Sequence, residues 1–225
     1  MSLLSEQMIP GNKFGQGWEN LRIGITGGSG ALGLSLSRTL RSKGAFVIGL
    51  THRAITYEQY NSDDCPNKWV QWECGKEEEL DGLFETLDIL ILNHGINSVG
   101  TLNHDELNQA LEINALSSWR LLERFEQIVL SKPESLNTRE IWINTSEAEI
   151  QPAFNPSYEI SKRLIGQLVS FKSSSLTNQE REKLKIRKII LGPFRSKLNP
   201  IGIMNSDLVA KQIIFQASFP LKLII

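Results

Sequence analysis

A glycine-rich turn between a short apolar run and a helix-patterned segment constrains the fold of this chain more than any other feature. The turn reads TGGSGALG at 26–33; it follows the apolar run at 21–25, and leucines recur downstream at positions 32, 36 and 40. A strand–turn–helix unit of this kind brings backbone N–H groups and a helix N-terminus close to a phosphate. A Walker-type phosphate loop is excluded because Leu34-Ser35 stands where a Lys-Ser/Thr pair would have to follow the last glycine. The turn therefore predicts a dinucleotide site.

The rest of the chain alternates between strand-like and helix-like segments. This alternation favours an α/β fold, a single Rossmann-type doubly wound parallel sheet of about seven strands with helices on both faces. The wholly apolar run 89–92 is typical of a central strand buried on both sides. The polar stretch 173–183 is expected to be a solvated helix end and loop. We place strands at 21–26, 45–50, 68–72, 87–93, 139–144, 186–191 and 221–225, and helices near 30–43, 76–86, 103–130, 155–173 and 205–217.

Composition excludes several classes of partner. The formal net charge is −1, with no block of one sign, so neither nucleic acid nor an anionic membrane surface is indicated. Apolar runs are too short to cross a bilayer, and Cys65 and Cys74 are too few and too poorly spaced with histidine for a zinc site. We therefore expect no metal, two free thiols, no membrane segment and a cytoplasmic protein.

Two further strand ends carry polar groups where a doubly wound sheet binds its ligand. The second strand ends in Thr51-His52-Arg53, where an NAD enzyme usually has a carboxylate for the ribose hydroxyls. An arginine there can pair with a 2′-phosphate, which favours NADP(H) over NAD(H); the alternative is a pair of ordinary surface-loop residues. The fourth strand ends in Asn93-His94-Gly95, whose glycine lets the backbone approach a ligand.

A candidate catalytic group lies in the second half of the chain. Tyr158 and Lys162 are four residues apart after the helix-start signal Asn155-Pro156, so both side chains should share one helix face. The helix N-terminus and the nearby ammonium both favour phenolate, which would bring the tyrosine pKa into a useful range. Ser146 follows the strand at 139–144 and could donate to a substrate carbonyl oxygen.

Asn114 lies on the apolar stripe of a predicted helix, so its amide should point inward and find partners. It either holds a group that links to Lys162 or satisfies the helix locally. Singly, each of these residues has an ordinary structural explanation. Their joint occurrence with the glycine turn favours a site for hydride transfer.

These residues resemble the short-chain dehydrogenase/reductase family over 20–225, with 1–19 as an irregular N-terminal segment. Residues 26–33 are similar to its cofactor loop, 93–95 to its Asn-Asn-Ala-Gly segment, and Tyr158-x-x-x-Lys162 to its catalytic pair. Within that family, 93–97, 144–149 and 191–202 resemble the reductase portion of cyanobacterial proteins that also carry a sterol-desaturase-like region. The resemblance implies a homo-oligomer formed through the helices near 103–130 and 155–173, an NAD(P)-binding domain, a catalytic set of Asn114, Ser146, Tyr158 and Lys162, and cofactor contacts from Gly27, Ser29, Gly30, Ala31, Leu32, Thr51, Arg53, Asn93, Gly95, Tyr158, Lys162 and Pro193.

The chain departs from the family pattern at several points. Ala31 replaces a common glycine, and the spacing from Ser146 to Tyr158 is one residue short, which leaves Thr145 as an alternative for the serine role. The segment at 195–204 is short for a substrate lid, which predicts an open pocket. Glu147 and Glu149 either select a cationic or polyhydroxylated substrate or are solvated loop charges, and the second is favoured.

The sequence thus predicts an NADP(H)-dependent oxidoreductase that transfers hydride between nicotinamide and a small carbonyl or alcohol, with Tyr158 as acid and base. The rival from another class is an NADP(H)-binding sensor with weak or no turnover. A nucleotide-sugar epimerase or dehydratase is disfavoured, because it would need a larger substrate domain after the sixth strand. The identity of the substrate does not follow from the sequence.

Overall fold

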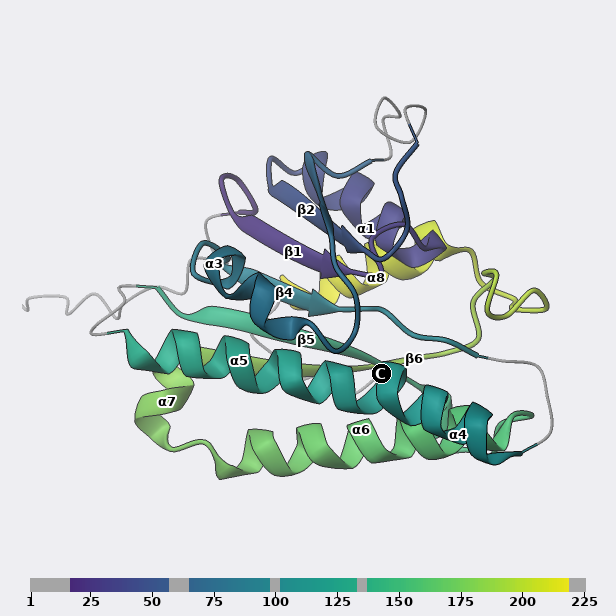
Figure 1. The fold of residues 1–225 in the computed structure, drawn as a ribbon. Coiled ribbons are helices and arrows are strands. Elements are labelled where there is room, and N and C mark those ends of the chain that lie inside the picture. The colour runs from purple at the N-terminus through teal and green to yellow at the C-terminus, as the bar shows by residue number, and fades with distance from the viewer. Residues whose placement is uncertain (1–16, 57–64, 98–101, 133–136, 219–225) are drawn as a thin grey trace, which may run out of the picture.

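In the computed structural model, which describes residues 17–56, 65–97, 102–132 and 137–218, a parallel sheet lies between two layers of helices (Figure 1). Its strands follow the order β3-β2-β1-β4-β5-β6. The strands are β1 (Arg22–Thr26), β2 (Phe46–Thr51), β3 (Lys68–Gln71), β4 (Ile89–Leu92), β5 (Arg139–Ser146) and β6 (Leu184–Leu191). The helices and helical turns are α1 (Ala31–Arg41), η2 (Glu77–Leu80), α3 (Asp81–Phe84), α4 (His104–Leu111), η3 (Glu112–Leu116), α5 (Ser117–Ser131), η4 (Glu147–Glu149), α6 (Pro156–Ser175), α7 (Asn178–Lys183) and α8 (Ser206–Ala217).

The strand order reverses direction between β1 and β4, which makes this the topological switch point of the sheet. All five strand pairings are parallel, so the strands end at the same edge. The central β4 is buried along its whole length, as its apolar sequence predicts. Ligands of doubly wound sheets bind beyond these carboxyl ends, which places the predicted site residues at one edge.

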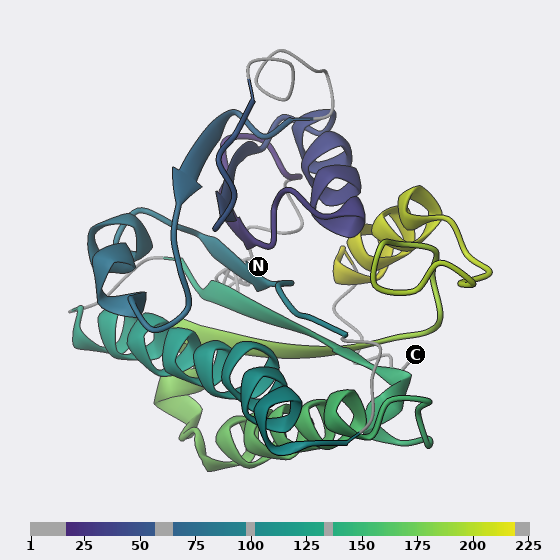
Figure 2. The ribbon, with the colours of Figure 1, turned by 45° about the vertical axis from the view of Figure 1, so that its right-hand side comes forward.

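Two apolar cores hold the layers together, one on each face of the sheet. Leu121, Leu122 and Phe125 of α5 belong to the first core, and Leu36 and Leu40 of α1 to the second. In Figures 1 and 2, α5 and α6 cover one face, while α1 and α8 lie side by side on the other. The helical spacing of leucines at 32, 36 and 40 that predicted α1 therefore corresponds to its buried stripe.

The predicted elements agree with the structure except at three places. The described residues contain six strands rather than about seven; the predicted strand at 221–225 lies outside them. The polar stretch 173–183 was predicted as a helix end and loop; α6 does end at Ser175, but the loop is wrong, because Thr177 and Glu180 form a capping box that starts α7. The long helix predicted at 103–130 is interrupted by the π-helical turn η3.

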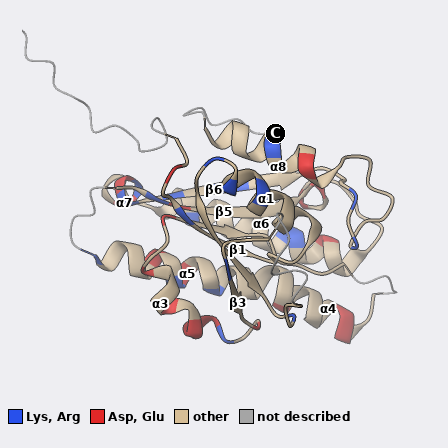
Figure 3. Cartoon of the chain, turned by 90° about the horizontal axis from the view of Figure 1, so that it is seen from above, with Lys and Arg blue, Asp and Glu red and all other residues tan. Residues whose placement is uncertain are grey.

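Charged residues of both signs are interspersed over the elements drawn in Figure 3. None of the helices in the described ranges is long and apolar enough to cross a membrane. Neither Cys65 nor Cys74 forms a disulfide within the described part of the chain.

Candidate active site

The glycine turn packs directly against the end of β4. Gly27 has a φ of +63°, and a Cβ there would lie 2.9 Å from the Cα of His94. A Cβ on Gly33 would lie 2.4 Å from the carbonyl oxygen of Gly27. Glycine at these two positions allows the turn to fold down at the switch point, next to the segment that follows β4.

The N-terminus of α1 is open to an anion. Its cap is Gly30, which has no side chain to accept a hydrogen bond, and the first turn of α1 contains no acidic residue. The first N–H groups of a helix have no intrahelical acceptor and carry the positive end of the helix dipole. Ala31 and Leu32 present their N–H groups here, so the departure from glycine at position 31 leaves the backbone donors in place.

The end of β2 borders the same turn. The hydroxyl groups of Ser29 and Thr51 are 2.9 Å apart, which joins the glycine turn to the second strand end. His52 and Arg53 follow with exposed side chains, and the backbone N–H of Arg53 donates to Thr51 Oγ1 at 3.2 Å. The predicted pyrophosphate and ribose contacts therefore lie along one continuous edge.

Buried polar groups hold the Asn93-His94-Gly95 segment in place. Thr26 Oγ1 accepts the backbone N–H of Asn93 at 2.8 Å and lies 2.8 Å from His94 Nδ1. Burial, reinforced by the charge of Lys162, lowers the pKa of His94 to about 4, so its imidazole is neutral at neutral pH. The ring packs edge-on against Trp72, at 5.3 Å between centroids. The His94 ring thus anchors this segment, and Asn93, His94 and Gly95 all border the cavity described below.

Asn144 at the end of β5 carries an unpaired acceptor beside this segment. Its Nδ2 donates to Asn93 Oδ1 at 3.0 Å, whereas its own Oδ1 is buried without a hydrogen-bond partner in the described part of the chain. A buried acceptor in this state marks a position where a ligand donor would fit.

Tyr158 and Ser146 lie close together at the N-terminus of α6. Asn155 caps this helix by accepting the N–H groups of Ser157 and Tyr158, with Pro156 at the first helical position, as the sequence predicts. Burial raises the pKa of Tyr158, and a hydrogen bond with Ser146 offsets this only in part. The expectation of a lowered tyrosine pKa is therefore wrong for the free protein: burial, reinforced by the charge of Glu147, outweighs the hydrogen bond with Ser146, so the phenol stays protonated at neutral pH.

Lys162 lies one turn along the same helix. Its Nζ is 5.7 Å from the centroid of the Tyr158 ring, and a Cβ on Gly95 would lie 3.7 Å from that Nζ. Burial lowers the pKa of Lys162 to about 8, although the carboxylate of Glu149 acts in the opposite direction. The ammonium is thus charged at neutral pH and lies near both the phenol ring and the segment after β4.

Ser146 and Thr145 point to different neighbours, which distinguishes the two candidates for the serine position. Thr145 is buried, and its Oγ1 donates to the carbonyl oxygen of Ile189 on β6 at 3.4 Å. Ser146 is half-buried and contacts Tyr158. The shortened spacing therefore still brings Ser146, and not Thr145, to the phenol.

Asn114 is buried at the centre of the π-helical turn η3, as its inward position predicts. Its Oδ1 accepts the N–H of Ile96 at 2.7 Å, and its Nδ2 donates to the carbonyl oxygen of Ile96 and to Ser161 Oγ, both at 2.9 Å. One amide therefore ties the segment after β4 to α6. Single-turn π-helices are frequent at functional sites because the extra residue re-aims a side chain.

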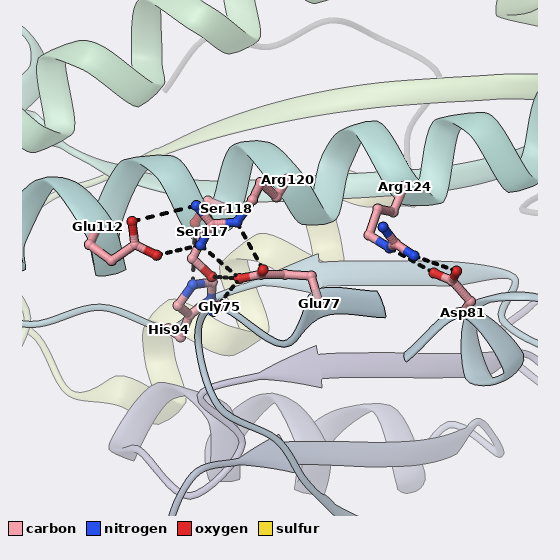
Figure 4. A network of polar contacts seen from close by, with 9 residues as sticks. All are labelled: Gly75, Glu77, Asp81, His94, Glu112, Ser117, Ser118, Arg120 and Arg124. Carbon is pink, nitrogen blue, oxygen red and sulfur yellow. Dashed lines mark hydrogen bonds and ion pairs between the residues drawn. The ribbon is translucent and has the colours of Figure 1, made fainter. Parts of the chain in front are cut away.

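A network of ion pairs and hydrogen bonds supports η3 (Figure 4). Glu77 accepts Arg120 Nε at 2.8 Å, Ser117 Oγ at 2.7 Å and the backbone N–H of Gly75 at 2.9 Å. The same guanidinium binds Glu112, the first residue of η3. The buried Glu77 therefore holds both ends of the turn that carries Asn114. Sequence reasoning missed this network, because its members are far apart in the chain and fit no motif.

A cavity of about 550 Å³ opens over these groups. It is bordered by the segment after β4, the end of β5, the start of α6 and the loop after β6, including Asn93, Gly95, Ser146, Glu147, Tyr158, Lys162 and Pro193. The prediction of a solvated Glu149 is wrong: its carboxylate is buried, bonds Lys188, and lies where a Cβ on Gly166 would be only 2.1 Å from its Cδ. Glu147, by contrast, faces the cavity.

Comparison with known families identifies the chain. Residues 23–170 match the model of the NAD dependent epimerase/dehydratase family. The chain belongs to this family. It is also 39% identical, over 194 residues, to the monoglucosyldiacylglycerol epimerase of the cyanobacterium Synechocystis sp.; the match covers 86% of this chain and 46% of that protein. The chain thus spans about half the length of this relative.

Solved short-chain dehydrogenases share the fold at low sequence identity. The enzyme from Burkholderia cenocepacia in complex with NADP superposes with a TM-score of 0.74 at 15% identity, over 91% of this chain and 86% of that one. The enzyme from Leptospira borgpetersenii with bound NAD⁺ gives a TM-score of 0.73 at 19% identity, over 95% of this chain and 91% of that one. The predicted resemblance to the short-chain dehydrogenase/reductase family is confirmed.

Chain length stays an untested argument against an epimerase, since the epimerase relative is about twice as long as this chain. The matching family model carries that activity in its name, and the epimerase relative aligns along most of this chain. The predicted cofactor residues of the glycine turn and the Tyr158-Lys162 pair lie inside the matched residues 23–170.

Proposed function

We propose that the chain binds NADP(H) and that Tyr158 moves a proton to or from an oxygen of the substrate. The observation that carries this proposal is one juxtaposition: Tyr158, its partner Ser146 and the buried Lys162 border the same cavity as the segment after β4. That segment lies at the switch point of a doubly wound sheet, where such folds bind dinucleotides.

Three features of the chain fit a dinucleotide. The uncapped N-terminus of α1 suits a pyrophosphate, the backbone at Gly27 approaches β4 without a side chain, and the unpaired Asn144 Oδ1 offers an acceptor. We assign pyrophosphate contacts to Gly27, Ser29, Gly30, Ala31 and Leu32, adenosine-ribose contacts to Thr51 and Arg53, and nicotinamide-side contacts to Asn93, Gly95, Pro193, Tyr158 and Lys162. Arg53 has no carboxylate beside it in Thr51-His52-Arg53, which is the basis for preferring NADP(H).

The residues of the chain divide the proton chemistry among them. The bound cofactor supplies or accepts the hydride. Tyr158 is protonated when the cavity is empty, so it is ready to donate a proton to a carbonyl oxygen. Removal of a proton from an alcohol requires the phenolate, which the positive charge of Lys162 stabilises. Ser146 orients the substrate oxygen, and Asn114 steadies the backbone at Ile96.

A second candidate for the net reaction is epimerisation of a sugar hydroxyl. The relative from Synechocystis is named for this reaction on a glycolipid. Epimerisation uses the same residues, because a carbinol is oxidised and the resulting ketone is reduced on its other face. The cofactor is then regenerated in each cycle, whereas a net oxidoreductase consumes it.

The alternative hypothesis, an NADP(H)-binding sensor, predicts tight binding of the cofactor without turnover. NADPH fluorescence titration, followed by incubation of the protein with NADPH and short-chain carbonyls and, separately, with NADP⁺ and monoglucosyldiacylglycerol, separates the three possibilities. Net oxidation of NADPH indicates a reductase, a changed sugar with no net reduction of NADP⁺ indicates an epimerase, and binding alone indicates the sensor.

The variant Tyr158→Phe tests the proton-transfer role directly. We expect turnover to fall about 10²- to 10⁴-fold while NADPH affinity changes little, since general acid–base catalysis typically contributes that factor. Ser157→Ala is the matched control, because the neighbouring Ser157 Oγ is buried without a hydrogen-bond partner in the described structure. Equal activity of Tyr158→Phe and Ser157→Ala would contradict the assignment.

We propose that the protein is cytoplasmic. We also propose that two copies of the chain associate through the outer face of α6. Ile160 and Phe171 are eleven residues apart, which places them on one face of α6, and both are exposed apolar residues. Sedimentation velocity of Phe171→Ser tests this: the variant should be monomeric if this face forms the dimer.

A further inference from the structure

The mouth of the cavity is apolar and faces solvent. Four of the residues that border it are exposed large hydrophobic residues: Phe154 at 101% of its reference area, Ile203 at 86%, Ile201 at 79% and Leu198 at 44%. Phe154 precedes the cap of α6, and the other three lie in the loop between β6 and α8. We call these four side chains the apolar rim. Exposed apolar groups that gather at a binding cavity usually mark an interaction site.

The loop after β6 holds its part of the apolar rim in a defined arrangement. Arg195 N–H donates to the carbonyl oxygen of Met204 at 2.8 Å, and Ile203 N–H donates to that of Pro193 at 3.1 Å, so the two ends of the loop pair. Gly202 is buried, and a Cβ there would lie 2.1 Å from the carbonyl carbon of Phe194. The backbone between Ile201 and Ile203 thus packs against Phe194, while the two isoleucine side chains remain exposed.

The same loop is basic. Residues 194–204 contain Arg195 and Lys197 but no Asp or Glu, and both basic side chains are exposed. The net charge of −1 for the whole chain conceals this local excess, because acidic residues elsewhere balance it. Cationic groups beside exposed apolar ones are the combination by which proteins bind the interface of an anionic lipid layer.

We propose that the apolar rim docks onto a lipid layer, with Arg195 and Lys197 facing its anionic headgroups. The cavity mouth then opens toward the layer, so a lipid whose polar headgroup carries the reacting hydroxyl reaches Tyr158 without leaving its neighbours. This use of the site rests on the proposed function; the docking itself does not. A second copy of the chain is a poorer occupant, since a two-fold contact through this loop would bring its like charges together.

Vesicle flotation of the whole chain tests the docking. Wild-type protein should float with phosphatidylcholine vesicles that contain phosphatidylglycerol, and less well with phosphatidylcholine alone. The double variant Ile201→Ser/Ile203→Ser and the single variant Phe154→Ser should each lower the partition coefficient at least about ten-fold, since each removes buried apolar contact with the layer. Arg195→Gln/Lys197→Gln should remove only the gain from anionic lipid, which high salt should also remove.

Phe46→Ser is the matched control, because Phe46 is likewise an exposed phenylalanine but starts β2, at the end of the strand opposite the cavity. It should float like wild type. Unchanged flotation of both rim variants would overturn the proposal, as would rim variants that convert a dimer to a monomer without changing flotation. NADPH titration of the same variants separates the two proposals: loss of lipid binding with intact NADPH affinity concerns the rim alone, and absence of NADPH binding in the wild type concerns the proposed function alone.

Discussion

We predict that the ionised carboxylate of Glu77, which supports the candidate active site, also stabilises the folded protein. Its side chain is only 3% exposed. Burial alone would raise its pKa, but hydrogen bonds from Arg120, the backbone N–H of Gly75 and Ser117 bring the pKa down from 4.5 to about 2. One pKa unit corresponds to about 1.4 kcal/mol, so the ionised carboxylate contributes about 3 kcal/mol to folding at neutral pH. Glu77→Gln should lower the free energy of unfolding by about that amount.

The contribution of Glu77 to the free energy of unfolding should decrease as the pH falls. Because the pKa of Glu77 is lower in the folded state, its contribution is present above the unfolded pKa of 4.5 and is lost as the pH falls toward about 2. Urea unfolding of the wild type and Glu77→Gln at several pH values between about 7 and 2 should therefore show a difference that shrinks on acidification. A difference that does not depend on pH would refute the reasoning.

A neighbouring ion pair provides the control. Asp81 binds Arg124 in the same view (Figure 4), but both side chains are partly exposed, at 46% and 35%. Exposed pairs contribute about 0–1 kcal/mol, so Asp81→Asn should change stability little. Glu77→Gln should also lower turnover more than Asp81→Asn does, since only Glu77 supports the turn η3 that carries Asn114. Equal losses of stability in the two variants would likewise refute the assignment.

Three other predictions follow from the site and its surroundings. Arg53→Ala should weaken NADPH binding about ten- to a hundred-fold and leave NADH binding unchanged, as measured by fluorescence titration, and equal loss for both cofactors would contradict a 2′-phosphate contact. The affinity of the wild type for NADPH should begin to fall above about pH 8, where Lys162 loses its charge, and this fall should be absent in Lys162→Met. Gly166→Ala should destabilise the protein by about 1–3 kcal/mol in urea, because its Cβ would strike the carboxylate of Glu149, whereas Gly82→Ala, which has open space around it, should be neutral or stabilising.

Much of the fold could be predicted from the sequence because its signals are local. The glycine turn, the alternation of strands and helices and the start of α6 at Pro156 all depend on residues close together in the chain. The positions of Tyr158 and Lys162 on one helix face follow from their spacing for the same reason. The capping box at Thr177 is also a local signal, but the polar composition of the residues around it is typical of a loop.

The state of the site could not be predicted, because it depends on burial by distant parts of the chain. The direction of the Tyr158 pKa shift, the buried pair of Glu149 with Lys188 and the support of η3 by Glu77 all arise from contacts between segments far apart in sequence. The apolar residues of the loop after β6 look in sequence like ordinary core residues. In the structure Gly202 packs closely against Phe194, while Ile201 and Ile203 on either side of it are exposed.

The amino-acid sequence by itself determined the type of fold, the edge at which a dinucleotide would bind and the pair of side chains offered for proton transfer, since short-range periodicity and turn chemistry encode all three. The tertiary structure alone decided which of those groups are desolvated, which carboxylates are paired and which apolar residues stay exposed. The physical reason is that hydration and ionic pairing depend on neighbours in space, and the order of residues along the chain does not specify those neighbours.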